Sequence, residues 1–236
     1  MMRDITFLGK SFQNDFGCQV KSGKVPPPNK RKNKQQVAFS NYVEDFSELY
    51  GMQVYEERTL TYVIHLIDYK GVSSQRVYDL EEEINNFIMP GMRGQLIDSF
   101  MPDVYFEAEV ITGPDLELLK ETGEQTIEFV AYPFKIFLLE EGNDEWDPYN
   151  LEKGFSQLTE YQINGVQEIK LWNVGVNLLN PVIDSSERMT IEKEGQIYEV
   201  QKGENRFIDL PLMPGENNLT IKGNGLITFH FHRELI

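Results

Sequence analysis

One segment of the chain carries the hydrophobic repeat of an amphipathic helix. Between Ser74 and Met89, apolar side chains recur every three to four residues, and three consecutive glutamates at 81–83 fall on the opposite face. A Pro-Gly pair at 90–91 follows directly and ends the pattern. The sequence therefore predicts one helix over 74–89 whose apolar face packs on a sheet.

The remainder of the first 139 residues has the pattern of strands. Apolar segments and alternation between apolar and polar positions predict strands at 5–8, 52–57, 60–68, 104–111 and 126–134. Residues 115–122 fit a short helix or a strand equally well. We expect an α+β N-terminal domain over 1–139, with a small sheet and one helix.

The character of the chain changes after residues 140–148, which are acidic, contain Gly and Pro, and have no periodicity. Turn-forming residues then recur at intervals of about eight to twelve positions, for example at Asn164-Gly165 and Gly223-Asn224-Gly225. Many short strands separated by turns predict an antiparallel sandwich or jelly roll without a helix. We therefore expect a mainly β protein with an acidic linker over 140–148 and a β-sandwich domain over 149–236.

The distribution of charge is uneven. The formal net charge is −16, yet residues 16–43 hold six basic side chains and no acidic one, so the rest of the chain carries −16 − 6 = −22. Three consecutive prolines at 26–28 can neither continue a helix nor donate ladder hydrogen bonds. A projecting arm over about 18–43 is predicted, with an acidic surface of a neighbouring copy as its electrostatic partner.

The candidate interface residues of this arm are Lys21, Lys24, Pro26, Pro27, Pro28, Lys30, Arg31, Lys32 and Lys34. Composition alone fits equally well with a solvated, partly disordered loop, because the stretch has little apolar surface to bury.

Several classes of protein are excluded or disfavoured by composition. A pI near 4.6 argues against a nucleic-acid binder, which needs a basic footprint. The sequence contains no apolar run near the ~20 residues of a membrane span, and its N-terminus does not read as a secretory signal. Cys18 is the only cysteine, so an intramolecular disulfide and a thiolate zinc cage are excluded. No phosphate loop, dinucleotide fingerprint or nucleophile elbow occurs, and we expect neither enzymatic activity nor a cofactor.

Two pairs of residues resemble chemical sites in spacing only. His230 and His232 would share one face of a strand within reach of one metal ion, but no third ligand is identifiable. Glu107 and Glu109 would likewise share a strand face and could mimic a glycosidase carboxylate pair, but hydrolysis needs two carboxylates that flank a bond in a cleft, about 5–9 Å apart. We interpret them as two solvated carboxylates on a half-exposed strand. We predict no metal site and no catalytic residue.

Aromatic side chains in the second half suggest an alternative function. Trp146, Tyr161 and Trp172 could stack on sugar rings if they shared an exposed surface, whereas buried positions would indicate packing in the core and linker.

Collinear motifs over most of the chain resemble the distal tail proteins of long-tailed, non-contractile bacteriophages. In chain order they are Phe7-Leu8-Gly9, Asn14-Asp15-Phe16-Gly17, the helix at 76–89, Pro102-Asp103-Val104-Tyr105-Phe106, Phe129-Val130-Ala131-Tyr132-Pro133-Phe134, Asn173-Val174-Gly175 with Asn180-Pro181, Leu212-Met213-Pro214-Gly215-Glu216-Asn217 and Arg233-Glu234-Leu235.

The resemblance implies a structural hub. It implies an N-terminal domain that forms a homo-hexameric ring, an arm that wraps the neighbouring copy, and a galectin-like C-terminal sandwich outside the ring. The implied partners are the tail-tube protein, a tail-associated baseplate protein, and receptor-binding or peripheral baseplate proteins, at the tail tip of a virion assembled in the bacterial cytoplasm. DNA would pass through the ring without stable binding, and no membrane contact is implied. The alternative function is a carbohydrate-binding module that recognises cell-wall glycan through the sandwich.

Overall fold

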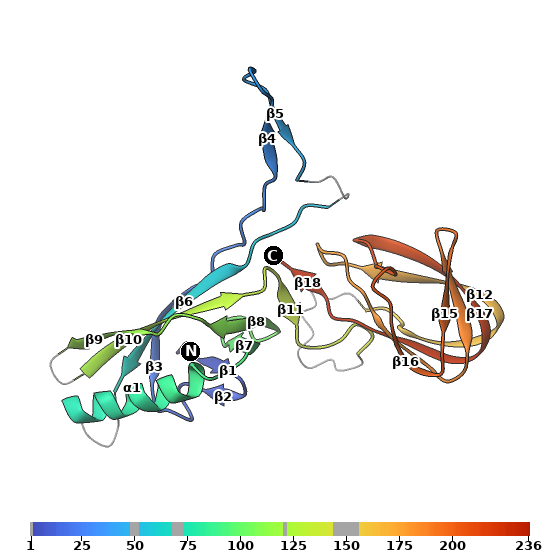
Figure 1. Cartoon of the computed structure of the whole chain (residues 1–236). Coiled ribbons are helices and arrows are strands. Elements are labelled where there is room, and N and C mark those ends of the chain that lie inside the picture. Colours follow the sequence, from blue (N-terminus) through green and yellow to red (C-terminus); the bar gives the residue numbers. More distant parts are fainter. Residues whose placement is uncertain (1, 48–51, 68–72, 120–121, 144–155) are drawn as a thin grey trace. The chain divides into compact units, whose positions relative to one another are not determined.

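The computed structural model describes residues 2–47, 52–67, 73–119, 122–143 and 156–236. The chain divides into two compact units, residues 1–135 with Ile236 and residues 136–235. Strands dominate both units, and the described residues contain one helix, α1 (Ser74–Ile88). The prediction of a mainly β protein with a single helix is therefore confirmed (Figure 1).

A mostly antiparallel sheet forms the body of the first unit. Its strands lie in the order β2-β1-β7-β8-β10-β6-β3, and β9 lies beside β10. The strands are β1 (Ile5–Phe7), β2 (Lys10–Ser11), β3 (Gln19–Lys24), β6 (Arg58–Leu66), β7 (Gly94–Asp98), β8 (Val104–Val110), β9 (Asp115–Leu119) and β10 (Thr122–Ala131). The ambiguous segment 115–122 thus contains a strand, whereas the predicted strand at 52–57 forms only an isolated bridge at Tyr55.

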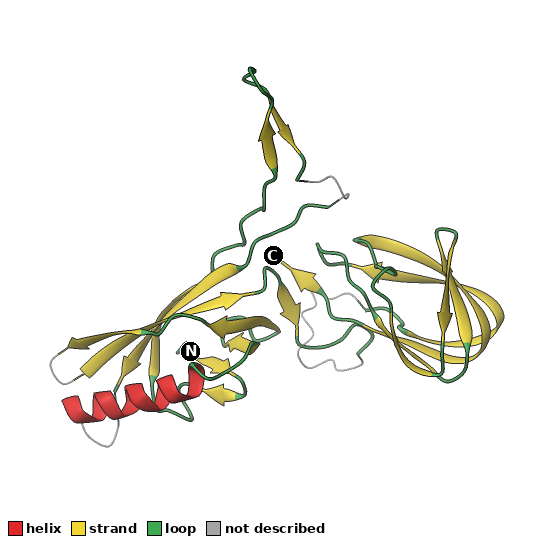
Figure 2. Ribbon diagram, viewed as in Figure 1, coloured by secondary structure: helices red, strands yellow, loops and turns green. Residues whose placement is uncertain are grey.

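Helix α1 covers one face of this sheet, as Figure 2 shows. The Ser73 hydroxyl caps the helix by accepting the Arg76 N–H at 3.3 Å, and the helix ends before Pro90, as predicted. Ile84 and Ile88 on its apolar face are fully buried. Beneath it, Phe7 and Phe129 pack edge to face with centroids 5.1 Å apart, an arrangement that stabilises aromatic cores.

The second unit is a sandwich built on one sheet in the order β15-β14-β17-β13-β16, with β12 paired to β17. The strands of this sheet are β12 (Glu160–Asn173), β13 (Val182–Ser185), β14 (Met189–Lys193), β15 (Gln196–Val200), β16 (Gly203–Arg206) and β17 (Gly215–His230). Outside this sheet, β11 (Lys135–Phe137) pairs with β18 (Glu234–Leu235). The sandwich prediction is confirmed for the described residues of this half.

The longest strands differ from the predicted pattern. β12 and β17 pair without interruption from Glu160↔Thr228 to Asn173↔Gly215. Asn164-Gly165 and Gly223-Asn224-Gly225, predicted as turns, face each other inside this ribbon. Gly165 and Gly223 have φ of 83° and 151°, a region that glycine enters without steric cost. The glycines therefore bend continuous strands here, so that β14 pairs with one half of β17 and β13 with the other.

Buried amides fasten the loops at one end of the sandwich. The Asn217 side chain donates to the carbonyls of Met213 (2.7 Å) and Gly215 (3.1 Å), and its Oδ1 accepts the Met213 N–H (2.8 Å). The same oxygen accepts a hydrogen bond of 3.1 Å from Nζ of the buried Lys193. Asn173 acts in the same way on the other loop, by donating to the Leu212 carbonyl at 2.9 Å. Two of the motifs found in the sequence therefore serve to hold loops.

We expect Asn217→Ala to destabilise the sandwich by about 2–4 kcal/mol, because it removes four hydrogen bonds and leaves buried partners unsatisfied. Urea unfolding followed by tryptophan fluorescence measures this, since both tryptophans lie in the second half of the sequence. The exposed neighbour Asn218 provides the control, and Asn218→Ala should change stability by less than ~0.5 kcal/mol. If the two substitutions lowered stability equally, the stabilising role that we give to the buried hydrogen bonds of Asn217 would be wrong.

The predicted linker, 140–148, is described only as far as Asn143. Its first residues are bound within the second unit: the Glu141 N–H donates to the Phe231 carbonyl at 3.0 Å, and its carboxylate accepts Arg233 Nη2 at 2.8 Å. The division between the two units falls after Lys135, a few residues before the position expected from composition.

Candidate assembly surface

The predicted arm contains a β-hairpin between β3 and β6. Strands β4 (Lys34–Gln36) and β5 (Val43–Asp45) pair antiparallel, with Lys34 opposite Asp45 and Gln36 opposite Val43. Six residues, 37–42, form the connection, in which the Ser40 N–H donates to the Val37 carbonyl at 3.2 Å. The local sequence favours this turn, because polar Ser40-Asn41 separates two short apolar segments.

Every residue from 29 to 45 is exposed in the chain. The tip presents four apolar side chains, Val37, Phe39, Tyr42 and Val43, and Phe39 is fully exposed at a φ of 60°. Large apolar side chains gathered on one exposed element typically mark an interaction surface. We call residues 29–45 the arm and these four residues the arm tip.

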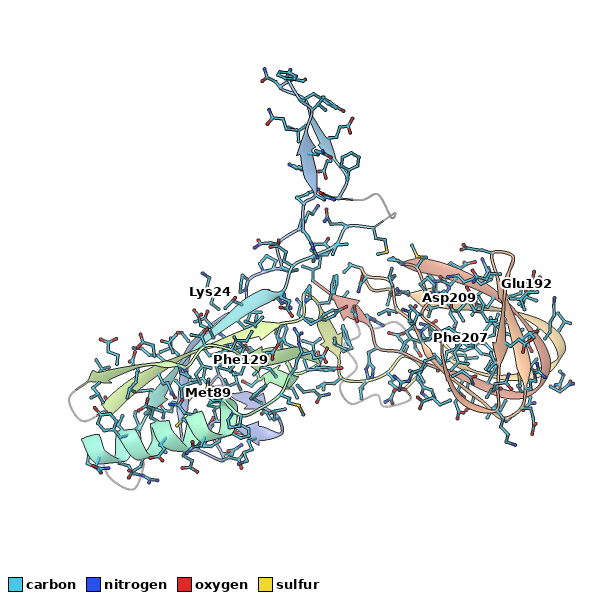
Figure 3. All side chains as sticks on the ribbon, in the orientation of Figure 1. Lys24, Met89, Phe129, Glu192, Phe207 and Asp209 are labelled. Atoms are coloured by element: carbon cyan, nitrogen blue, oxygen red, sulfur yellow. The ribbon has the colours of Figure 1, made fainter. Side chains whose placement is uncertain are left out.

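At its root the arm is two antiparallel segments joined by backbone hydrogen bonds. The Arg31 N–H donates to the Val54 carbonyl at 2.9 Å, and the Glu56 N–H donates to the Asn29 carbonyl at 2.9 Å. The prolines at 26–28 lead from β3 into this root, and Lys24 marks the point where the chain leaves the sheet (Figure 3).

The arm is less basic than its sequence suggested, because the hairpin returns acidic residues beside the basic ones. Lys32 Nζ lies 3.2 Å from an Asp45 carboxylate oxygen. Hydrogen bonds from Ser47, and secondarily from Lys32, lower the pKa of Asp45 to about 2. Residues 29–45 hold four basic and two acidic side chains, a net charge of +2 against −18 for the remainder.

The nine candidate interface residues do not form one surface. Lys21 and Lys24 belong to β3, and Lys21 Nζ lies 2.5 Å from Glu124 on the same sheet. The prolines precede the arm, and only Lys30, Arg31, Lys32 and Lys34 lie on it. Sequence reasoning missed the arm tip, although the apolar residues around Ser40-Asn41 carried a signal for a hairpin.

The face of the first sheet opposite its core is acidic. Burial alternates along β8 and β10, so that Glu107, Glu109, Glu124 and Glu128 lie on the face away from the buried positions. We call these four residues the acidic sheet face. Glu107 and Glu109 therefore belong to a charged surface that extends over two strands.

The aromatic candidates for glycan stacking do not share a surface. Tyr161 points to the core side of β12, where its ring packs edge to face on Phe229 at 6.4 Å. Trp172 is eleven residues farther along the same uninterrupted strand and therefore points to the other side, 39% exposed. Trp146 lies outside the described residues. Tyr161 and Trp172 thus form no common platform.

His230 and His232 both approach one carboxylate. His230 Nδ1 lies 2.9 Å from Glu140 Oε2, and His232 Nε2 lies 3.7 Å from Glu140 Oε1. His232 Nδ1 also donates to the Phe137 carbonyl at 2.8 Å. No group of three or more potential ligands arranged for a metal ion occurs among the described residues. None of the described helices is long and apolar enough to span a membrane.

Comparison with solved structures gives a match along the whole chain. The Dit protein of SPP1, described as a paradigm of the hub adsorption apparatus in phages that infect Gram-positive bacteria, aligns over 100% of both chains with a TM-score of 0.67 and 11% identity. Two structures of the phage p2 baseplate in its activated conformation, with Sr and with Ca, align at 9% identity with TM-scores of 0.39 and 0.42, covering 99% and 100% of this chain and 97% and 99% of theirs.

No family model and no curated protein matches the sequence. The full-length match to the SPP1 protein confirms, at the level of fold, the resemblance inferred from the motifs.

Proposed function

We propose that this chain is a structural hub of a bacteriophage tail tip, in which six copies form a closed ring. The observation that carries the proposal is the shared fold with the SPP1 hub protein over the full length of both chains. A closed ring satisfies every subunit contact, whereas an open arrangement of the same contacts would grow into a filament.

The arm is the element that we assign to contacts between copies. Its exposed apolar tip has no partner among the described residues of its own chain, and its net charge of +2 faces a remainder of −18. Opposite charge steers association, and burial of the tip would supply the hydrophobic part of the contact.

The acidic sheet face is assigned to the wall of the channel. Carboxylates repel a phosphate backbone, so DNA would pass without being held. In this arrangement a tail-tube protein and a tail-associated baseplate protein contact the two sides of the ring, and receptor-binding or peripheral proteins attach to the sandwich. The protein then acts at the virion tail tip, after assembly in the host cytoplasm, through association and without catalysis. The separate faces of Tyr161 and Trp172 give no support to a glycan-binding function.

Native mass spectrometry of the purified chain tests the proposal. We expect a species of 164.4 kDa, six times the 27.4 kDa of one copy, at micromolar concentration. Raising the salt concentration should weaken it, because exposed charge contacts are screened over about 8 Å in physiological salt. A single species of 27.4 kDa at all concentrations would refute the ring.

A further inference from the structure

Arg58 is a buried cation with an incomplete set of partners. It is the first residue of β6 and is 4% exposed. Its Nη1 donates a long hydrogen bond of 3.4 Å to the Pro26 carbonyl, and its guanidinium carbon lies 4.6 Å from the centroid of the Phe106 ring. Its Nε and Nη2 atoms are buried and have no hydrogen-bond partner in the described part of the chain.

The two unsatisfied atoms define one edge of the guanidinium group. Nε–H and Nη2–H point in nearly parallel directions, and this edge fits the two oxygens of a carboxylate. Burial lowers the pKa of Arg58 to about 10, so the group is still charged at neutral pH. A buried charge without a counter-ion is strongly unfavourable, and the isolated chain therefore bears a cost that its own described residues do not offset.

The position of Arg58 connects this cost to the arm. Arg58 lies where the returning segment enters the sheet, and Pro26, its only hydrogen-bond acceptor among the described residues, lies on the outgoing segment. Gln53, also at the root, has a buried Oε1 without a partner. Of the five buried side-chain atoms without a partner in the described residues, three therefore lie within 53–58. Unsatisfied polar groups are concentrated at the root of the arm.

We propose that the free edge of Arg58 binds a carboxylate side chain from a second copy of this chain when copies assemble. This inference rests on the proposed function, because it needs a neighbouring copy at the root of the arm. Charge complementarity favours that source, since the chain has 38 acidic against 22 basic side chains. The segment that carries the Pro26 carbonyl has little backbone hydrogen bonding to lose if it shifts to admit the carboxylate, because the prolines at 26–28 have no N–H to donate.

The substitution Arg58→Met tests the proposal through two effects of opposite direction. Methionine keeps the contact with the Phe106 ring but removes the charge. The isolated chain should therefore unfold at higher urea concentration than the wild type, while the dissociation constant of the assembly rises at least 100-fold. A guanidinium that only stabilises the fold gives the reverse result, lower stability with unchanged assembly, and that result would overturn the proposal.

Two further variants complete the experiment. Arg58→Lys keeps the positive charge but removes the paired donors that bind a carboxylate in bidentate fashion. It should therefore weaken assembly without stabilising the isolated chain. Arg188→Met removes an exposed guanidinium paired with Glu199 and should change neither property.

The outcomes separate this proposal from the proposed function. A wild-type chain that never self-associates refutes both. Wild-type and Arg58→Met rings of equal stability refute the role of Arg58 alone. Arg58→Met rings that form normally but fail to enter tails would assign the edge to another tail component and overturn the second copy as its partner.

Discussion

A chain that lacks the hairpin of the arm is expected to remain folded and to lose ring formation. Asn33 and Phe46 are cross-strand partners, joined by a hydrogen bond of 2.8 Å from the Phe46 N–H to the Asn33 carbonyl. A two-residue Asn-Gly turn can therefore replace 34–45 without opening the root. The deletion removes the arm tip but no residue of either core, because all of 34–45 is exposed. Native mass spectrometry should then give 27.4 kDa in place of the ring.

A charge-reversal variant separates the two parts of the arm contact. Changing Lys30, Arg31, Lys32 and Lys34 to Glu keeps the apolar tip and inverts the charge that faces the acidic remainder. We expect the variant to weaken the ring less than the deletion does. The difference in ring stability from the wild type should shrink as the salt concentration rises, because salt screens the repulsion. Melting temperatures equal to that of the wild type serve as the control for folding. A hairpin deletion that still forms rings would remove the arm from the assembly surface.

The second large effect is expected at Asp98, the centre of a buried ionic network in the first unit. Asp98 is fully buried and accepts hydrogen bonds from Arg3 Nε at 3.0 Å, from the Tyr62 hydroxyl at 3.1 Å and from the Phe100 N–H at 3.0 Å. Arg3 Nη1 also donates to the Gly23 carbonyl at 2.7 Å. Burial, and then the proximity of Asp98, raise the pKa of Tyr62, so its hydroxyl stays protonated and donates. The network joins β7, β6 and β3 to the N-terminal segment.

Asp98→Ala leaves the guanidinium of Arg3 and the hydroxyl of Tyr62 without their shared acceptor. We expect the free energy of unfolding of the first unit to fall by about 3–5 kcal/mol. Hydrogen exchange of β1, β6 and β7 measures the loss in the first unit directly. Asp115→Ala, at an exposed position of β9, is the matched control and should cost less than ~0.5 kcal/mol. The double variant Arg3→Met with Asp98→Leu should regain much of the stability, because it removes both charges. A loss below ~1 kcal/mol for Asp98→Ala would contradict this account.

Local pattern predicted the elements in which sequence and environment agree. The helix followed from apolar spacing and the proline at 90, and β8 followed from strict alternation. The two Asn-Gly and Gly-Asn-Gly segments failed as turn signals because a φ above zero serves a bend inside a strand as well as a hairpin. Nothing local distinguishes these uses, since the partner strand lies more than fifty residues away in sequence.

The candidate site shows the same limit. The prolines and basic residues predicted an arm, but Glu44 and Asp45 were left out of it because pairing with Lys34 and Gln35 is a property of the folded hairpin. Lys21 and Lys24 were included because their charge resembles that of the arm, whereas packing against β6 places them in the sheet. Arg58 carried no signal at all, since an unpaired edge is visible only when every neighbour is placed.

The β12–β17 ribbon also decides when the second unit can form during synthesis. β17, the strand that joins β12, β13 and β14, is the last strand of this sheet to be made, and its final pairs close a loop from Glu160 to Thr228. Before that strand is available, β14 can pair only with β15 and β13 only with β16, and nothing joins these two pairs to each other or to β12. The sheet of the sandwich can therefore close only after β17 has been translated, and until then the core side of its earlier strands stays partly exposed to solvent.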